Sequence, residues 1–540
     1  MDGAPLYLEP HLEPPLASLL ESAAFLHTLV DALGSPLNVV LPEQIAQNVE
    51  RFRAAYRRHN LAGQVFFAHK ANRSSALVRR LAATDAGIDV ASLAELQHAL
   101  GAGFTPDRIL ATGPKNPEFR WLAARSGVTV SVDGPTELDE LDALVRRHSL
   151  ARVRALLRLS EFEAPGAKVL SRQTHFGTSV RSLDRLLDVV ERHQETVQPI
   201  GVAYHLDTTS LDEKAIALEG CLLAMDALRN RGFQPRVIDV GGGFGVNYLA
   251  HAAQWERYTT ELTNSVLGKR PPMTWSGHGY GLRAEGGTLR GTLSLYPAHR
   301  PVAGAAYLDE LLSLPAPTLG RPLGTLLLEN LYDLHTEPGR SLADQCGLSL
   351  ARVLEVRRTA TGDCLVRLGM KASDASLEEH GVLMDPVLLP RPGAAAGVEG
   401  GGERRERRGR EAGGERGAGG EEGAGGEGGE RSDAGGGAAN PQGTQDAGTP
   451  ASPVAVHLTG NLCLEADLIT RRTVYLPRLP QPGDLLAFAN TAGYCMDFSA
   501  THAQQQPVAR KVAVHRDGGS WRWCLDEQYW PITRPGGQQI

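Results

Sequence analysis

Short apolar runs and amphipathic segments alternate along the first two thirds of the chain. Apolar runs rich in β-branched residues predict buried strands, whereas apolar residues recurring every three or four positions predict helices packed against those strands. The predicted strands lie at 65–68, 88–90, 109–112, 128–132, 153–159, 200–205, 236–240 and 326–328. The predicted helices lie between them, at 74–81, 92–101, 117–125, 135–147, 183–192 and 212–229.

This order of elements indicates an α/β fold. Eight strands that alternate with helices predict a parallel (β/α)8 barrel, which we place at residues 40–345. The interval 249–325 is too long for one connecting helix and contains aromatic and glycine-rich segments, so we expect an insertion there. We expect residues 1–39 to form an N-terminal segment that packs on the second domain.

The pattern changes after the barrel, and residues 346–540 predict an all-β domain. Short apolar runs separated by turn residues lie at 350–358, 364–368, 454–458, 473–476, 485–489 and 512–515. A tract at 393–450, rich in Gly, Glu, Arg and Ala, interrupts this domain and predicts disorder, because it has too little apolar surface to bury. Its charges are mixed in sign, which favours a solvated linker over a nucleic-acid-binding arm.

Composition narrows the class of protein. The 540 residues carry 55 Lys and Arg against 62 Asp and Glu, a net charge of −7, so we expect no nucleic-acid or membrane partner. We expect no secretory leader and no membrane span, because no apolar run reaches roughly 18–20 residues. Six cysteines without CxxC spacing predict reduced thiols in a cytoplasmic protein, with no metal site. Only seven of the 55 basic residues are lysines, so each lysine is a candidate for a specific role.

One of these lysines, Lys70, directly follows the first predicted barrel strand. Active sites of such barrels lie at the carboxyl ends of the strands. Apolar surroundings can lower the pKa of a lysine by desolvation, and the neutral amine can then form a Schiff base with a carbonyl. The alternative is a lysine whose stem packs on the strand end while its charge reaches water.

Further candidates follow the seventh and eighth strands, where barrels of this kind often bind phosphate. The seventh strand runs into Gly241, Gly242 and Gly243, whose backbone N–H groups can approach an anion closely; an ordinary tight turn is the alternative. The eighth strand is followed by an acid and a base, Glu337 and Arg340.

Three candidates come from other strands. His205 ends the sixth strand and could stack on a ring, or could be a histidine satisfied in the core. Asp89 in the second strand and Arg158 in the fifth lie near carboxyl ends, where a structural ion pair is the alternative. Together, a lysine, a phosphate cradle, a stacking histidine and an acid that faces a pyridine nitrogen match the needs of pyridoxal 5′-phosphate (PLP).

The ordered motifs resemble the fold-type III PLP-dependent decarboxylases, the group of diaminopimelate, ornithine and arginine decarboxylases. Diaminopimelate decarboxylase-like proteins are the most similar branch. The matching segments are 67–72, 87–96, 112–115, 176–177, 239–244, 337–340, 460–463, 483–484 and 493–494. The resemblance implies an alanine-racemase-like barrel followed by a C-terminal β-barrel or β-sandwich domain.

The resemblance also implies a role for each matched residue. Lys70 would carry the Schiff base, His205 would stack on the cofactor ring and Glu337 would pair with the pyridine nitrogen. Cys463 would come from the partner subunit of a head-to-tail homodimer and protonate the reacting carbon after CO2 leaves. The remaining cofactor-binding positions would be Asp89, Arg158, Gly241, Gly242, Gly243, Gly339, Arg340 and Tyr494.

Departures from the family pattern cluster around the phosphate and the far end of the substrate. The segment 207–210, Asp-Thr-Thr-Ser, stands where the family usually has a Gly-Ser pair. A carboxylate so close to a phosphate would be unfavourable, so Asp207 should point away or have another role. Leu464, followed by Glu465, replaces an acid that grips the distal amino group of the substrate. His502 replaces an aromatic residue and His175 replaces a lysine. A distal ammonium left unpaired costs a few kcal/mol, so we expect a substrate other than diaminopimelate.

The sequence therefore predicts a PLP-dependent decarboxylase of an α-amino acid. A racemase or epimerase on the same fold is one alternative, but the residues after Lys70 lack the glycine-rich continuation of such enzymes. A catalytically silent relative that binds a partner protein is another, but this chain keeps Lys70, the three glycines, Glu337, Arg340 and Cys463.

Overall fold

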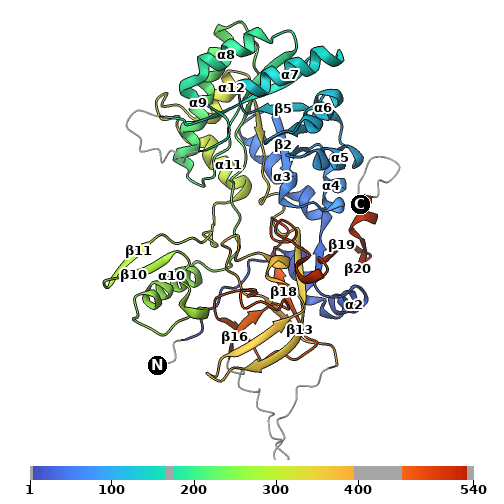
Figure 1. Cartoon of the computed structure of the whole chain (residues 1–540), viewed down its shortest axis with the longest axis vertical. Helices are drawn as coiled ribbons and strands as arrows, with labels where there is room; N and C mark the ends of the chain where they lie inside the picture. Colours follow the sequence, from blue (N-terminus) through green and yellow to red (C-terminus); the bar gives the residue numbers. More distant parts are fainter. Residues whose placement is uncertain (1–3, 164–173, 394–452, 532–540) are drawn as a thin grey trace, which may run out of the picture. The chain divides into compact units, whose positions relative to one another are not determined.

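The computed structural model describes residues 4–163, 174–393 and 453–531 (Figure 1). Within them, parallel strands close into an eight-stranded barrel, since β5 pairs with both β4 and β6. The order around the ring is β2 (Gly63–Ala68), β3 (Gly87–Val90), β4 (Ile109–Ala111), β5 (Thr129–Val132), β6 (Val153–Ser160), β8 (Val197–Ala203), β9 (Val237–Asp239) and β12 (Asp333–Thr336). A two-residue strand, β7 (Thr178–Ser179), extends the sheet at β6.

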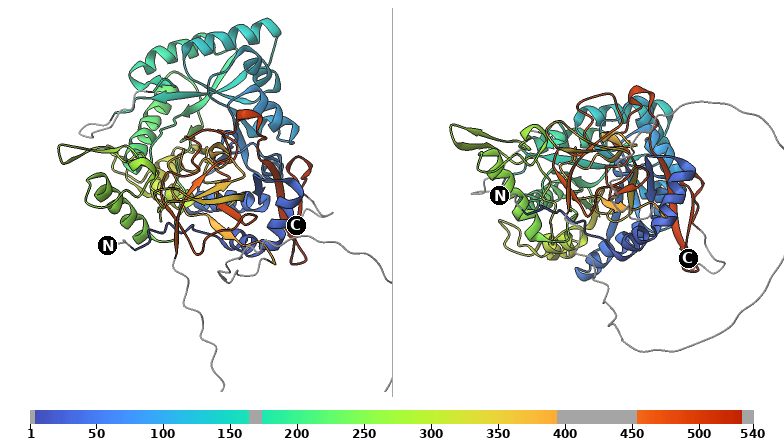
Figure 2. Two further views of the ribbon diagram at one scale, coloured as in Figure 1. Left: turned by 60° about the horizontal axis from the view of Figure 1, so that its bottom comes forward. Right: turned by 90° about the horizontal axis from the view of Figure 1, so that it is seen from below.

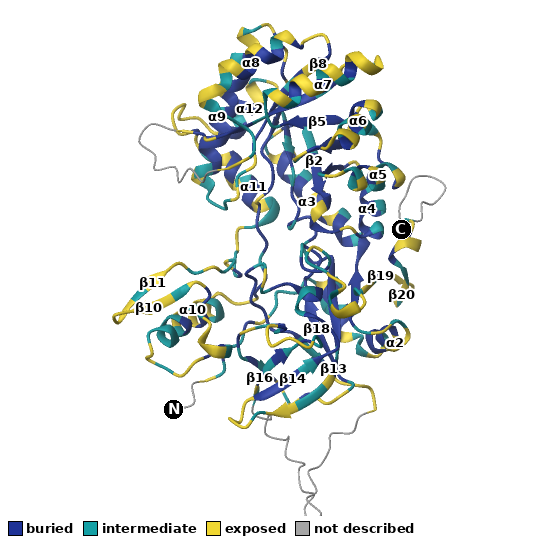
Figure 3. Cartoon of the chain, in the orientation of Figure 1, coloured by how far each residue is buried: buried dark blue, intermediate teal, exposed yellow. Residues whose placement is uncertain are grey.

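Helices follow the strands and bury their apolar faces against them, while their outer faces are exposed (Figure 3). Several begin at a residue whose side chain accepts a backbone N–H, as Ser74 does before α4 and Asn116 before α6. The helices of the barrel are α3 (Pro42–Arg58), α4 (Ser75–Ala82), α5 (Leu93–Gly101), α6 (Pro117–Ser126), α7 (Pro135–His148), α8 (Leu183–Arg192), α9 (Leu211–Asn230), α11 (Gly304–Ser313) and α12 (Leu323–Glu329).

The fold class predicted from the sequence is confirmed, but one strand was misplaced. The apolar run 326–328 lies in helix α12, and the eighth strand is β12, seven residues further on at Asp333–Thr336. In α12, Leu323, Leu326 and Leu327 are buried while Leu328 is 40% exposed, so the leucines mark one face of a helix. The strand itself is hard to recognise, because its interior-facing His335 is polar.

Between β9 and α11 the chain makes an excursion that packs away from the barrel helices. It contains α10 (Ala252–Val266) and the hairpin of β10 (Leu282–Glu285) and β11 (Thr288–Gly291), coloured green in Figure 2. Tyr258, Leu262 and Tyr280 of this excursion belong to the same buried apolar cluster as the second domain. The excursion is also tied to that domain by the backbone bond from Thr473 N–H to the Met273 carbonyl, 3.0 Å.

The second domain is a β-sheet domain into which the N-terminal part of the chain is built. Strand β1 lies between β13 and β19: Leu37 pairs with Leu350 antiparallel and with Arg510 parallel. Helices α1 (Pro14–Glu21) and α2 (Ala23–Leu33) precede it. The strands are β1 (Leu37–Val40), β13 (Gly347–Arg358), β14 (Cys364–Leu368), β15 (Val387–Leu389), β16 (Val454–Thr459), β17 (Val474–Leu476), β18 (Leu485–Ala489), β19 (Arg510–Asp517) and β20 (Ser520–Leu525).

Two further expectations concern the low-complexity tract and membrane-spanning helices. The tract expected to be disordered, 393–450, lies outside the described residues beyond Gly393. In the described part of the chain, no single helix is long and apolar enough to cross a membrane; α1 and α2 reach that length only together, across a bend of 73°.

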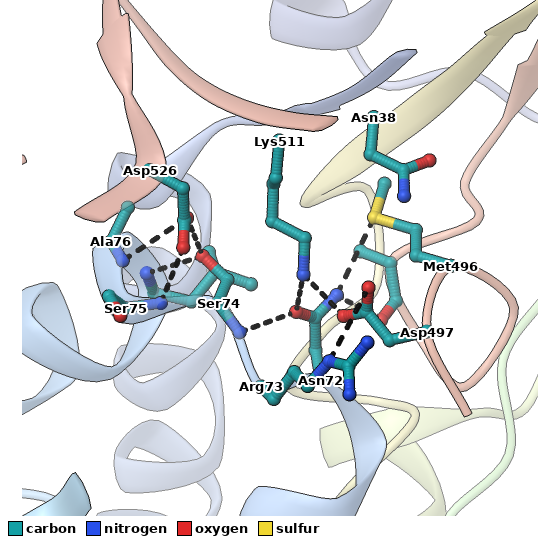
Figure 4. A network of polar contacts seen from close by, with 12 residues as sticks. Asn38, Asn72, Arg73, Ser74, Ser75, Ala76, Met496, Asp497, Lys511 and Asp526 are labelled. Atoms are coloured by element: carbon teal, nitrogen blue, oxygen red, sulfur yellow. Dashed lines mark hydrogen bonds and ion pairs between the residues drawn. The ribbon is translucent and has the colours of Figure 1, made fainter. Parts of the chain in front are cut away.

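A polar network joins the segment after β2 to the second domain (Figure 4). The Asn72 amide donates to the Ala492 carbonyl at 2.8 Å, and its oxygen accepts from Lys511 Nζ at 3.0 Å. The Asp526 carboxylate accepts the backbone N–H groups of Ser75 and Ala76, at 2.7 and 3.3 Å, and the Ser74 hydroxyl. Since Lys70 lies just before this segment, the second domain fixes the backbone that carries it.

We predict that Asp526→Ala lowers the free energy of unfolding by about 2 kcal/mol, because three donors, two of them buried, lose their acceptor. A urea titration of the full chain measures this loss. Asp517→Ala is the matched control, since that carboxylate is 69% exposed and pairs with Arg522 at 3.7 Å; its effect should be about 0.5 kcal/mol or less. Equal losses in the two variants would contradict the anchoring role of Asp526.

Candidate active site

A cavity of about 560 Å³ opens at the carboxyl ends of the barrel strands. Lys70, Arg158, His205 and Glu337 all line it; Arg158 lies near the end of β6, and each of the others follows a different strand. This is the face where barrels of this class carry their chemistry. His175 and Asp207, two of the departures from the family pattern, also line the cavity.

The register of the strands explains how charged side chains reach this cavity. Ala203 pairs with Asp239 of β9 on one side and with Arg158 of β6 on the other, so the three side chains point the same way. Ala203 and Val237 belong to the small apolar cluster that fills the barrel interior. Side chains two residues apart share a face of a strand, so Val237 and Asp239 both face the barrel interior. The interior is therefore apolar at Val237 and charged at Asp239, closer to the carboxyl end of the strand.

Three carboxyl groups, Asp89, Asp239 and Glu337, gather at this end of the barrel. Asp89 is only 2% exposed and accepts a hydrogen bond from the Thr112 hydroxyl. Asp239 Oδ1 accepts from the Gly241 N–H at 2.8 Å, and among the described residues its Oδ2 has no hydrogen-bond partner. Burial and mutual repulsion raise the pKa of Asp239 to about 7 and that of Glu337 well above its usual range.

Lys70 lies in the short 3-10 turn His69–Ala71 that follows β2. Burial lowers the pKa of Lys70, but Asp89, Tyr494 and Glu337 outweigh it, so the pKa lies above the ordinary value for lysine. Desolvation acts in the expected direction, but the net pKa is raised instead of lowered, because the sequence did not show how close the acids come. The amine is therefore protonated at neutral pH in the site as it stands.

His205 lies beside the glycine loop. A Cβ at Gly242 would lie 3.4 Å from His205 Nε2 and 2.9 Å from the Glu337 carbonyl oxygen, and a Cβ at Gly241 would lie 2.6 Å from the Tyr204 carbonyl oxygen. Side chains at these positions would therefore collide with backbone. His205 is exposed toward the cavity, but the protein packed around it and the nearby cations lower its pKa to about 3, so its ring is neutral at neutral pH.

A tyrosine from the second domain completes this side of the site. The Tyr494 N–H donates to the Ala71 carbonyl at 2.8 Å, one residue after Lys70. A Cβ at Gly339 would lie 2.6 Å from the Tyr494 hydroxyl oxygen. The Arg340 guanidinium lies 5.2 Å from the centre of the Tyr494 ring and donates to the Tyr248 hydroxyl at 2.8 Å.

Four residues that the family resemblance places near the substrate lie elsewhere: Cys463, Leu464, Glu465 and His502. None of them lines the cavity, and all are exposed; Leu464 is 57% exposed. The Cys463 N–H donates to the Gln504 side chain at 3.0 Å. Within one chain the structure therefore brings together residues predicted to bind the cofactor, but it does not bring to them the four residues predicted to face the substrate.

Two residues to which the sequence analysis gave no role complete the surroundings of the cavity. Phe176 lines the cavity, and Arg158 lies over its ring at 4.7 Å from the centre. Lys214 is fully buried in α9, next to the glycine loop. The scarcity of lysines in the chain was the signal that could have drawn attention to Lys214.

The residues present fit pyridoxal 5′-phosphate. The loop 241–243 has no side chains, so its backbone lies close against His205 and Glu337, and Gly339 and Arg340, which would also face the phosphate, follow Glu337 in the chain. Lys70 offers the amine, His205 a neutral ring and Glu337 a carboxyl group that can hold a proton near a pyridine nitrogen. A parallel barrel that carries these groups at the carboxyl ends of its strands is typical of the barrel proteins that bind PLP.

Comparison with known proteins supports PLP as the ligand for which this barrel is built. Residues 43–288 match the family model "Pyridoxal-dependent decarboxylase, pyridoxal binding domain". The chain therefore belongs to the fold-type III PLP-dependent decarboxylase family.

Individual relatives differ in their sequence identity to this chain and in how much of it they cover. The uncharacterized protein y4yA of Sinorhizobium fredii is 26% identical over 505 residues, covering 90% of this chain and 88% of that protein. A diaminopimelate decarboxylase of Methanothermobacter thermautotrophicus is 30% identical over 246 residues, 41% of this chain and 52% of that enzyme. The crystal structure of a diaminopimelate decarboxylase from M. jannaschii superposes with a TM-score of 0.63 at 16% identity, covering 95% and 92% of the two chains, which shows the same fold.

We predict that Asp89→Asn moves the capture of PLP to lower pH. Lys70 must lose its proton before its amine attacks a carbonyl carbon. Burial already lowers the pKa of Lys70, and Asp89 is the largest of the influences that outweigh burial, so removing this charge lowers the pKa. The rate constant for PLP binding, followed by stopped-flow absorbance over a pH series, reports the midpoint.

The control for this shift is Asp107→Asn, which changes an exposed carboxylate outside the cavity lining. Its midpoint should equal that of the unmodified chain. A midpoint that stays in place or moves to higher pH in Asp89→Asn would contradict the charge arrangement described above.

Proposed function

We propose that the protein is a PLP-dependent carboxy-lyase that removes the α-carboxyl group of an amino acid. The observation that carries the proposal is the convergence of Lys70, Glu337 and His205 on one cavity at the carboxyl ends of the barrel strands, with the glycine loop packed against His205 and Glu337. Bound there, PLP supplies a protonated ring that delocalises the electron pair left on the α-carbon when CO2 departs.

The chain's own residues would hold the cofactor and manage protons. Lys70 would anchor it covalently and be released when the substrate amine takes its place. The raised pKa of Glu337, which follows from burial and from the neighbouring acids, suits a carboxyl group that shares a proton with the pyridine nitrogen. His205 would cover one face of the ring, while Gly241–Gly243, Gly339, Arg340 and Tyr494 would bind the phosphate.

Cys463 would donate the proton that replaces CO2 on the α-carbon. Its segment is exposed and does not line the cavity of its own chain, so this role requires the active site of a partner subunit. We therefore propose a head-to-tail homodimer with shared sites. The exposed Leu464, Glu465 and His502 would reach the same partner cavity and meet the distal part of the substrate, which is not diaminopimelate.

The direct test is a screen of amino acids for CO2 release by the PLP-loaded protein, with diaminopimelate, lysine, ornithine and arginine as controls. On the substrate found, Cys463→Ala should lower kcat roughly 10²-fold, the usual worth of a positioned acid. Cys524→Ala, at a half-buried thiol outside the cavity lining, should keep kcat within about twofold of the unmodified chain.

Two results would contradict the proposal. Chiral inversion of an amino acid without CO2 would identify a racemase. PLP binding without turnover across a broad panel would identify a catalytically silent relative.

The shared-site dimer predicts complementation between two inactive variants. When Lys70→Ala and Cys463→Ala chains are mixed and allowed to exchange, half of the dimers combine the two, and each of these has one intact site. Activity should recover to about a quarter of the unmodified level. Light scattering measures the oligomeric state, and co-purification of two differently tagged chains confirms exchange. Exchange without recovery would show that each chain carries its complete site.

A further inference from the structure

A fully buried lysine lies behind the glycine loop. Lys214 is in the first turn of α9 and has 0% of its surface exposed. Its Nζ donates to the Gly242 carbonyl oxygen at 2.5 Å and lies 5.5 Å from the centre of the Phe244 ring. A Cβ at Gly243 would lie 3.2 Å from this nitrogen, so the ammonium is in close contact with the loop.

This buried charge has no ionic partner in the described part of the chain. Two other buried lysines do: Lys115 pairs with Glu137 at 2.9 Å and Lys371 pairs with Asp374 at 3.0 Å. No carboxylate of the described residues lies within ion-pair distance of Lys214 Nζ. Burial lowers the pKa of Lys214 to about 8, which still leaves it mainly charged at neutral pH. An unpaired buried charge is costly unless an anion balances it.

The hydrogen bond to Gly242 determines where such an anion would lie. In a trans peptide the C=O and N–H groups point in opposite directions. Because the Gly242 carbonyl points at Lys214, the Gly243 N–H points away from it, to the other side of the same peptide plane. Lys214 therefore orients a donor toward the opposite side of the loop and places a positive charge close behind it.

The neighbouring loop gives a reason for this charge. Thr208 approaches the same glycine, since its carbonyl oxygen lies 3.0 Å from the Cβ position at Gly243. In this chain that loop carries Asp207 on the cavity wall. A cation behind the loop offsets the additional negative charge near an anion site.

We propose that Lys214 is a positioning residue for the cofactor phosphate. It orients the Gly242–Gly243 peptide through the carbonyl, and the phosphate dianion on the other side of the loop balances its charge. This inference rests on the proposed function, since it takes PLP as the ligand of the cavity.

The test compares PLP with pyridoxal, which has the same aldehyde and ring but no phosphate. Affinities are measured by absorbance titration of the full chain freed of cofactor, so no turnover is needed. Lys214→Met should weaken PLP binding about tenfold or more, equivalent to about 1.4 kcal/mol, while pyridoxal binding changes less than about twofold. Lys214→Gln keeps a donor for the Gly242 carbonyl but no charge, and it should show the same selective loss.

Lys115→Met is the matched control, because it removes a buried lysine that already has a carboxylate partner. It should leave the ratio of the two affinities unchanged. Equal weakening of PLP and pyridoxal in both Lys214 variants would mean a merely structural role and would overturn the inference. So would Lys214→Gln binding PLP as tightly as the unmodified chain, since the hydrogen bond alone would then suffice.

Binding of PLP and pyridoxal by the unmodified chain shows whether a failure concerns this inference or the proposed function. If it binds neither PLP nor pyridoxal, the proposed function fails and the inference fails with it. If it binds PLP and the Lys214 variants bind it equally well, only the inference fails. A variant that does not fold leaves the other variant to decide, since methionine and glutamine differ in polarity but both remove the charge.

Discussion

The cost of burying charge at the carboxyl end of the barrel is the constraint on which the rest of the structure depends. Asp89, Asp239 and Glu337 lie together in a place that disfavours ionised carboxylates, and their pKa values are raised accordingly. Lys70 and Arg158 offset part of this charge, and the raised pKa of Lys70 is the counterpart of the same interaction. A barrel whose interior served stability alone would be apolar throughout, as it is around Ala203 and Val237.

Holding such a cluster in place requires a rigid frame, and two domains provide it. The strand register directs Asp239 and Arg158 inward from the barrel side. The second domain contributes Tyr494 and fixes the segment after Lys70 through Asn72 and Asp526. Strand β1, from the N-terminal part of the chain, lies in the middle of that domain's sheet, so the domain is completed by chain from both sides of the barrel sequence.

Strong local patterns made much of the fold predictable. The barrel helices have clear apolar periodicity and capping residues, and seven barrel strands are β-branched runs in buried surroundings. The eighth strand was misplaced because the segment 326–328 is more apolar than Asp333–Thr336. The leucines belong to one face of a helix, whereas the strand carries polar residues toward the site. Strands β1, β15 and β20 were missed because they are completed by pairing with distant strands, which a local pattern does not show.

In the candidate site, too, local motifs were predictable, whereas contacts between distant segments were not. Lys70, His205, Glu337 and the three glycines could be named from motifs, since each follows a strand and has a distinctive residue type. Their electrostatics could not, because the pKa of Lys70 depends on Asp89 and Tyr494, which come from distant parts of the chain. Lys214 was not recognised for a similar reason: within α9 nothing marks it, and only its contact with Gly242 gives it a role.

The central claim is that this cavity holds PLP through the Lys70 amine, and one measurement tests it most directly. The PLP-loaded protein is reduced with borohydride, digested and analysed by mass spectrometry. The account predicts a phosphopyridoxyl group on the peptide that contains Lys70, and none on that peptide in Lys70→Ala. Modification of another lysine in its place, or no stable modification of the folded chain, would contradict the claim.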